Sequence, residues 1–147
     1  MMSKIANAEV VREFCEAYSR GDAKGAVALA AEDCVAVYPT LVRYTKDEWE
    51  RLLTEERRAF PDASIQIWTS VAQGDKVAIE FGWRATQKGE VRGATPTNRT
   101  FDLPCMLLFI LEDGKIKLVK YYWNTRLWDL HETVGGVAAQ ATTAEAR

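Results

Sequence analysis

The spacing of apolar residues changes abruptly at Pro61, and this change limits the folds that are open to the chain. Before Pro61, apolar side chains recur every three or four residues, which is typical of amphipathic helices. After it, apolar and polar residues alternate, which is typical of strands with one buried face. Because helices come first and strands follow, the sequence predicts an α+β protein.

Helix patterns in the first part of the chain predict three helices, over about residues 7–20, 23–31 and 45–60. Gly21 ends the first, and Asp22 is a suitable N-cap for the second. Thr45 and Glu48 have the spacing of a capping box, which marks the start of the third. A short β-prone run at 35–38 separates the second helix from the third.

Strand patterns follow at 65–70, 77–85, 101–111 and 116–123. The strand at 101–111 is apolar on both faces, so both faces need cover. We expect the helices to cover one face of a curved, mixed or antiparallel sheet, which gives a cone-shaped barrel around an apolar pocket. A second subunit is the natural cover for the other face, so the sequence predicts a homodimer.

The length of 147 residues favours a single domain, predicted here over residues 1–134. The segment 135–147 begins with two glycines and is rich in alanine and threonine, so we interpret it as a flexible tail. No apolar run approaches the roughly 18 residues of a membrane span. Three widely spaced cysteines indicate a reducing compartment, and we expect a cytoplasmic protein.

The composition argues against several classes of function. A net charge of -2 speaks against a nucleic-acid binder. One histidine and no paired cysteines are poor material for a metal site, and no phosphate-binding glycine motif is present. We therefore predict neither a metal nor another cofactor. Five Trp, five Tyr and five Phe instead favour an apolar pocket for a small hydrophobic substrate.

A set of short motifs resembles the SnoaL-like polyketide cyclase family, within the nuclear transport factor 2-like superfamily of α+β cones. The matching stretches follow the family order over about residues 8–131: 18–22 (YSRGD), 31–35 (AEDCV), 59–62 (AFPD), 73–78 (QGDKVA), 96–99 (PTNR) and 112–116 (EDGKI). The resemblance implies the fold more strongly than the activity, because this superfamily hosts many functions.

The chain departs from its relatives where they carry titratable groups. A histidine of the SnoaL-like pattern is replaced by Gln87, and an acidic residue after the last strand is replaced by Asn124. Ketosteroid isomerases share the fold, and their key positions fall at Phe14, Tyr38 and near Met106. None of these carries the group that the isomerase needs.

The candidate site residues follow from the resemblance and from strand alternation. We expect four polar side chains to act on the substrate: Tyr38, Asn124, Gln87 and Asp102. We expect seven side chains to line the pocket: Phe14, Tyr18, Trp68, Trp83, Met106, Leu108 and Tyr122. Each also has a structural interpretation, as core, as strand-end surface or as a cap.

Three functions stay open at this point. The favoured one is a cyclase that forms a ring in a polyketide-type intermediate, by an aldol-type or a pericyclic [4+2] route in an aromatic pocket. The second is a non-catalytic binder of small apolar ligands or an accessory dimer subunit. The third is an epoxide hydrolase or dehydratase that uses an acid such as Asp102, Asp62 or Glu56.

Overall fold

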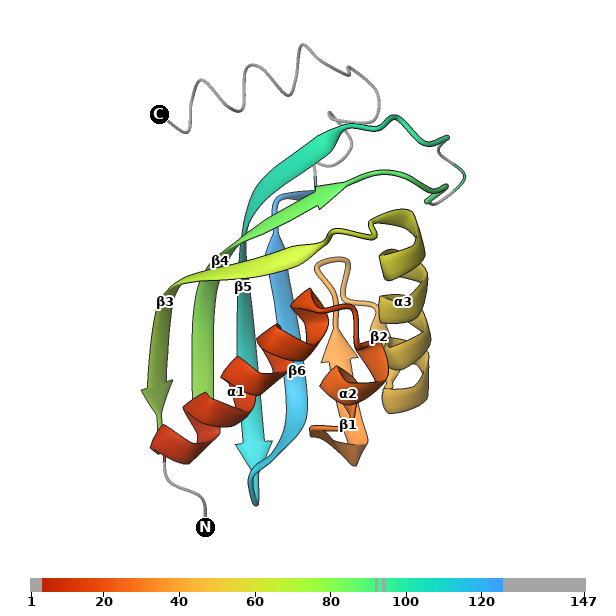
Figure 1. Ribbon diagram of the computed structural model, residues 1–147. Coiled ribbons are helices and arrows are strands. Elements are labelled where there is room, and N and C mark those ends of the chain that lie inside the picture. The colour runs from red at the N-terminus through yellow and green to blue at the C-terminus, as the bar shows by residue number, and fades with distance from the viewer. Residues whose placement is uncertain (1–3, 92, 94, 126–147) are drawn as a thin grey trace.

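Three helices pack on one side of a single curved sheet in the computed structural model, which describes residues 4–91, 93 and 95–125 (Figure 1). The helices are α1 (Lys4–Ser19), α2 (Ala23–Val27) and α3 (Lys46–Ala59). The strands are β1 (Ala30–Val37), β2 (Arg43–Thr45), β3 (Ser64–Gln73), β4 (Lys76–Thr86), β5 (Thr100–Glu112) and β6 (Lys115–Trp123). The α+β class is confirmed.

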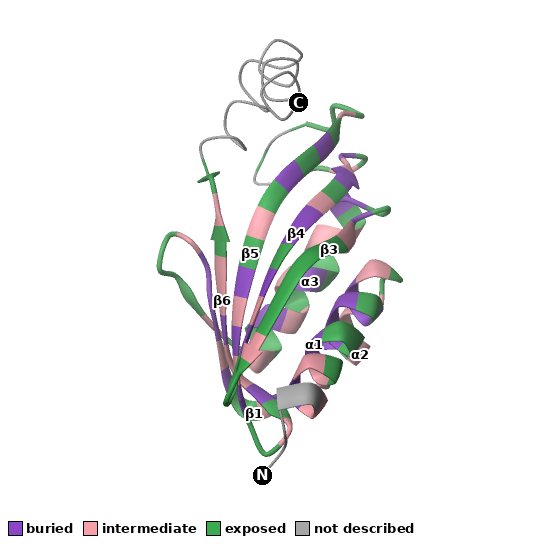
Figure 2. Ribbon diagram, turned by 90° about the vertical axis from the view of Figure 1, so that its left-hand side faces the viewer, coloured by how far each residue is buried: buried purple, intermediate pink, exposed green. Residues whose placement is uncertain are grey.

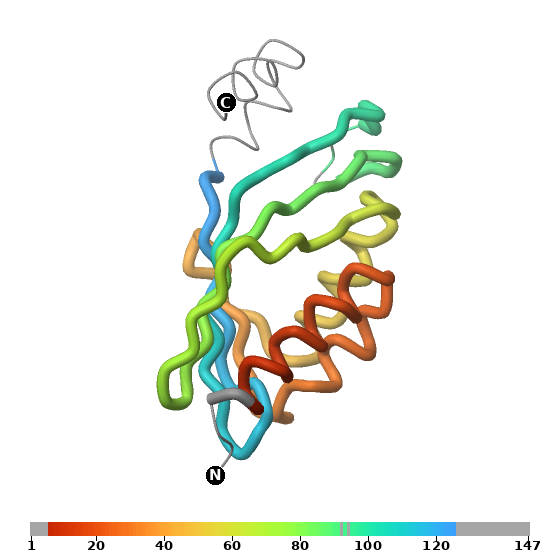
Figure 3. The backbone as a smooth tube through the Cα atoms, turned by 60° about the vertical axis from the view of Figure 1, so that its left-hand side comes forward, coloured from red at the N-terminus to blue at the C-terminus, as the bar shows by residue number. Residues whose placement is uncertain are grey.

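The sheet has the strand order β2-β1-β6-β5-β4-β3 and does not close into a complete barrel. Every neighbouring pair is antiparallel except β1 and β6, which are parallel. Figure 3 shows the sheet bending around the helices, so that its concave face is directed toward them. The mixed, curved sheet of the predicted cone is therefore confirmed.

The region between α1 and α3 differs from its prediction. Helix α2 ends at Val27, and strand β1 already begins at Ala30, where the sequence favours continued helix. Tertiary hydrogen bonds account for the early strand, because the Ile116 amide donates to the Leu29 carbonyl at 3.1 Å. The Lys46 ammonium also donates to the Ala30 carbonyl, at 2.8 Å. These bonds outweigh the high helix propensity of the alanines.

Helix α3 starts where its capping box predicts. The Glu48 amide donates to Thr45 Oγ1 at 3.3 Å, and the Thr45 amide donates to Glu48 Oε1 at 2.9 Å. These two bonds satisfy amides that the first helical turn leaves without partners. The cap fixes the rotation of α3 and thereby decides which of its side chains face the sheet.

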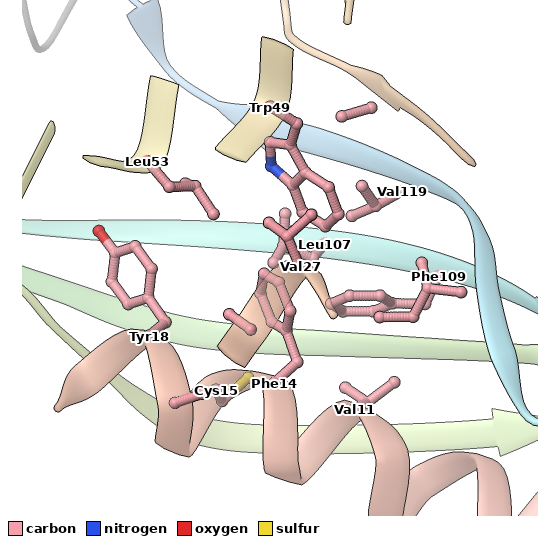
Figure 4. Close-up of a cluster of buried hydrophobic side chains, with 14 of the residues drawn as sticks. Val11, Phe14, Cys15, Tyr18, Val27, Trp49, Leu53, Leu107, Phe109 and Val119 are labelled. Carbon is pink, nitrogen blue, oxygen red and sulfur yellow. The ribbon is translucent and has the colours of Figure 1, made fainter. Parts of the chain in front are cut away.

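The core lies between the helices and the concave face of the sheet (Figure 4). Phe14 of α1 stacks on Trp49 of α3 with ring centroids 5.3 Å apart, and it meets the edge of Phe109 of β5 at 5.5 Å. All three side chains are at most 1 % exposed. Burying each ring stabilises the fold by roughly 1.5–3 kcal/mol.

Several parts of the chain lie outside the described residues. They include the predicted tail at 135–147 and the end of the predicted domain, up to residue 134. Within the part that the structure describes, no helix is long and apolar enough to span a membrane.

Candidate functional site

The pairing of the strands decides which side chains face the interior. Buried and more exposed residues alternate along β5 (Figure 2). The buried ones include Leu103, Leu107 and Phe109. Residues directly opposite in neighbouring strands share a face. Leu103 lies opposite Trp83 of β4, and Leu107 lies opposite Tyr121 of β6. Two large aromatic side chains therefore join the interior from the strands on either side of β5.

A carboxylate reaches this interior from helix α3. Trp49, Leu53, Glu56 and Phe60 are spaced by four, three and four residues, so they share one face of the helix. Trp49, Leu53 and Phe60 are buried, and Glu56 is half-buried among them. The position of Glu56 on an apolar face is unusual, because acidic side chains are rarely placed in a core without a partner.

The partner of Glu56 is the phenol of Tyr18, on helix α1. Its hydroxyl donates a hydrogen bond to Glu56 Oε1. The same hydroxyl oxygen accepts the indole N–H of Trp83, at 2.7 Å. Because the indole can only donate, the phenol proton is directed to the carboxylate. Three elements, α1, α3 and β4, thus hold one chain of donors that ends on Glu56.

Burial raises the pKa of Tyr18 well above its ordinary value, and the nearby charge of Glu56 raises it further. The phenol therefore stays protonated and keeps its role as donor at neutral pH. The Arg57 guanidinium lies 5.5 Å from the centre of the Tyr18 ring and donates to the backbone carbonyls of Tyr18 and Ala63. These bonds tie the end of α1 and the start of β3 to α3.

A second indole–phenol pair lies on the β6 side of the interior. The Trp49 indole donates to the Tyr121 hydroxyl at 2.9 Å. The ring of Tyr38, directly after β1, stacks on Tyr121 with centroids 4.2 Å apart. Burial raises the pKa values of both phenols, and Glu56 adds to each shift. Both therefore remain neutral hydrogen-bonding groups.

The charge of Glu56 acts on several groups of the interior. Its charge raises the pKa of Tyr18 on α1, Tyr38 after β1 and Tyr121 on β6. It also contributes to the pKa of about 12 of the half-buried Cys105 thiol on β5, although burial is the larger cause there. A single carboxylate surrounded by neutral phenols and indoles can accept and return one proton.

The predicted site residues fall into two groups. Phe14, Tyr18 and Trp83 face the interior, and Phe14 is packed so tightly that it belongs to the core. Tyr38 also faces the interior and is 8 % exposed.

The other pocket predictions are on the wrong face of the sheet. Met106 is 46 % exposed and lies opposite Tyr122, which is 52 % exposed. Leu108 and Asp102 follow the same parity in β5, and Asp102 forms an exposed ion pair with Arg84 at 3.6 Å. The prediction went wrong because β5 is apolar on both faces from Cys105 to Ile110, so its alternation does not reveal which face is inside.

Trp68 also lies outside, at 52 % exposure. Its ring covers Gly82, where a Cβ would come within 2.7 Å of the indole. Gly82 belongs to the outer face of β4, because it lies opposite Pro104 and between the inward Phe81 and Trp83. A glycine at this position is therefore what lets the indole lie flat against the outer surface.

Gln87 is buried, but its amide is used within its own loop. Its Nε2 donates to the carbonyls of Gly89 and Thr95, and its Oε1 accepts the Thr97 hydroxyl at 2.9 Å. The side chain therefore anchors the loop between β4 and β5. It is not part of the hydrogen-bonded chain from Trp83 through Tyr18 to Glu56. Asn124, at the end of β6, is exposed.

Glu56, Tyr121 and Trp123 are not among the residues that the sequence predicts for this site. The sequence indicates Glu56 only as a candidate acid of the hydrolase alternative. Its spacing from Trp49 and Phe60 on α3 is the signal that would have placed it. Tyr121 and Trp123 of β6 were missed because their neighbour Tyr122 was assigned to the inside. The third alternative acid, Asp62, accepts the backbone and side-chain donors of Thr86, both at 2.7 Å.

Among the described residues, no group of three or more His, Cys, Asp or Glu side chains is arranged to hold a metal ion.

Comparison with known families assigns the fold. The model of the SnoaL-like domain matches residues 11–119, which is most of the chain. This protein therefore belongs to the SnoaL-like domain family. No curated protein matches it in sequence.

Solved structures agree with that assignment at low sequence identity. A candidate SnoaL-like polyketide cyclase from Jannaschia sp. CCS1 has a TM-score of 0.81 at 15 % identity, over 88 % of this chain and 92 % of that chain. A candidate polyketide cyclase from Xanthomonas campestris has a TM-score of 0.79 at 22 % identity, over 85 % of this chain and 95 % of that chain. AclR from Streptomyces galilaeus is a candidate hydroxylase. It has a TM-score of 0.77 at 23 % identity, over 84 % of this chain and 92 % of that chain. These likenesses establish the fold, and the differing names leave the reaction open.

Proposed function

We propose that this protein is a cyclase that closes a ring in a hydrophobic polyketide-type intermediate by an aldol-type reaction. The observation that carries the proposal is the hydrogen-bonded chain from Trp83 through Tyr18 to Glu56, set among aromatic side chains. Family membership and fold relatives that include candidate polyketide cyclases support the substrate class.

Glu56 supplies the base that an aldol reaction needs. In the proposed first step, its carboxylate takes a proton from the methylene between two carbonyls of the substrate, which leaves an enolate. The enolate carbon then attacks a further carbonyl carbon, more distant along the same molecule, and this forms the carbon–carbon bond of the ring. The new alkoxide takes the proton back from Glu56, so the enzyme returns to its starting state.

The aromatic side chains supply the shape for this reaction. Trp83 packs edge-on against Phe60 at 5.1 Å, and Tyr121 and Trp123 stand on β6, at the other side of β5. Rings of this size favour an apolar chain folded back on itself, which brings the reacting carbons together. A carboxylate favours the aldol-type route over a pericyclic one, because a pericyclic closure requires no proton transfer.

The test uses a synthetic linear aryl polyketone thioester, and chromatography with mass detection follows the cyclised product. Wild type should cyclise the substrate faster than buffer, and Glu56→Gln should lower kcat/KM by about a hundredfold or more. Glu55→Gln is the matched control, because Glu55 is the exposed neighbour on the same helix. Equal rates for wild type, both variants and buffer would refute the proposal.

We also propose that two copies pair through the outer face of the sheet. This face exposes Trp68, Val71, Met106 and Tyr122, an apolar surface of the kind that marks an interface. Charges of both signs surround it, with Glu80 beside Met106 and Lys120 beside Leu108 in the register. Two copies placed face to face can therefore match opposite charges around a shared apolar centre.

Light scattering after size exclusion tests this pairing. Wild type should elute as a dimer, and Met106→Glu should shift it to the monomer. Asp113→Asn, a change in the turn between β5 and β6, should leave the mass unchanged. A monomeric wild type, or a Met106→Glu variant that stays dimeric, would refute this arrangement.

A further inference from the structure

The hydroxyl of Tyr38 is buried and unsatisfied. The side chain is 8 % exposed, and no residue that the structure describes offers its Oη atom a partner in hydrogen-bond geometry. A buried polar group without a partner destabilises the folded state, so folded proteins rarely keep one. A phenylalanine would fill the same space without that cost.

The Tyr38 ring is held so that its hydroxyl cannot swing out to solvent. Its face stacks on Tyr121, and its ring also makes edge-to-face contacts with Tyr44 at 5.1 Å and Trp123 at 5.6 Å. Its backbone is fixed as well, because the Tyr38 amide donates to the Val42 carbonyl at 3.0 Å. The phenol is thus positioned in advance, which is what a binding group requires.

The neighbouring polar groups already have partners. The Tyr121 oxygen accepts the Trp49 indole, and Glu56 accepts the Tyr18 phenol. Burial raises the pKa of Tyr38, and the neighbouring Tyr121 and Glu56 raise it further, so its proton is retained and its hydroxyl is able to donate. The Tyr38 hydroxyl is therefore an available donor in the same interior as the carboxylate that we propose as the base.

We infer that the Tyr38 hydroxyl donates a hydrogen bond to the carbonyl oxygen of a bound, flat and conjugated ligand, and to the enolate oxygen that forms from it. This inference rests on the proposed function for the enolate, and on the buried hydroxyl for the bond itself. A donor fixed before the reaction stabilises an oxyanion without having to reorganise. The surrounding rings favour a planar ligand over a branched one.

The first experiment compares the thermal stability of Tyr38→Phe and Tyr121→Phe without ligand. Tyr38→Phe should melt at the wild-type temperature or above, because it removes a hydroxyl that has no partner. Tyr121→Phe should melt about 2–4 °C lower, because it leaves the Trp49 indole unsatisfied. If Tyr38→Phe loses as much as Tyr121→Phe, its hydroxyl has a partner in the protein and the inference is wrong.

The second experiment measures binding of para-nitrophenolate, a flat aromatic oxyanion that resembles an enolate. Calorimetry is done in the Glu56→Gln background, where the amide takes the place of the protonated acid and does not repel the anion. Adding Tyr38→Phe should weaken binding about tenfold or more, the usual value of a hydrogen bond to a charged oxygen. Adding Tyr122→Phe on the outer face should leave the affinity unchanged.

The two proposals fail in different ways. If the added Tyr38→Phe changes affinity by less than about twofold, this inference is overturned, whatever Glu56→Gln does to turnover. If Tyr38→Phe weakens binding while Glu56→Gln keeps full cyclisation activity, the donor role stands and the proposed base is wrong.

Discussion

The two faces of the sheet carry similar aromatic residues, but these residues lie in different surroundings. The inner face places Trp83 and Tyr121 in hydrogen-bonded pairs with side chains of the helices. The outer face exposes Trp68 and Tyr122 on the same strands or their neighbours. An aromatic side chain by itself therefore says little about a site. Its parity in the strand, and a partner for its polar atom, decide whether it joins the hydrogen-bonded interior.

The largest difference between the faces should appear in stability. Phe14→Ala removes a ring that packs on Trp49 and Phe109, and it should lower the free energy of unfolding by about 3–5 kcal/mol. Tyr122→Ala, on the outer face, should lower it by about 1 kcal/mol or less. Urea unfolding of both variants measures the two values. Similar losses at both positions would contradict the assignment of the faces.

The buried phenols should make stability fall in alkaline solution. The pKa values of Tyr18, Tyr38 and Tyr121 are raised in the folded state, so the unfolded chain loses these protons first. Their contribution to stability is complete below about pH 10 and is lost above it, by about 1.4 kcal/mol per pH unit for each group.

Ultraviolet absorbance of phenolate during alkaline titration, together with urea unfolding at each pH, checks this dependence. Triple replacement of the three tyrosines by phenylalanine should flatten the decline above pH 10. A decline of unchanged steepness in the triple variant would show that other groups cause it.

The donor on Glu56 should set the acid side of the activity profile. Tyr18→Phe removes a hydrogen bond that stabilises the carboxylate form of Glu56. If the carboxylate is the proposed base, the acid limb of kcat/KM should therefore move to higher pH. Tyr121→Phe, which loses a phenol paired with an indole, should leave the limb in place. Equal shifts of the acid limb in both variants would contradict a specific effect of the Tyr18 hydrogen bond on Glu56.

The smallest effect is expected at Asp102, a residue that sequence reasoning placed at the mouth of the pocket. Its ion pair with Arg84 is exposed on both sides, and such pairs contribute about 0–1 kcal/mol. Asp102→Asn should therefore change neither stability nor cyclisation measurably. A marked loss of activity would return Asp102 to the site and would undermine the difference between the faces.

Much of the fold follows from the sequence alone, because helix and strand periods differ and turns have their own chemistry. The capping box at Thr45 and the alternation in β4 are read directly from residue order. The early start of β1 is not, because it depends on hydrogen bonds to Leu29 and Ala30 from distant residues.

The site was only partly predictable for a similar reason. Tyr38 and Trp83 were placed on the inner side by resemblance and by the clear alternation of β4, and Tyr18 by its position on the first helix. The inward residues of β5 were not, because its faces are equally apolar. Helical spacing in α3 is enough to place Glu56 on the inner side. Its hydrogen bond with the Tyr18 phenol could not be predicted, because it depends on how α1 packs on α3.

The central claim is that Glu56 moves a proton on the inner face, and proton exchange tests it without knowledge of the natural substrate. Benzoylacetone in deuterated buffer reports removal of its central methylene protons by NMR. Wild type and Glu55→Gln should speed the exchange above the buffer rate, and Glu56→Gln should return it to near that rate. Equal acceleration by wild type and Glu56→Gln, or none by wild type, would contradict the claim.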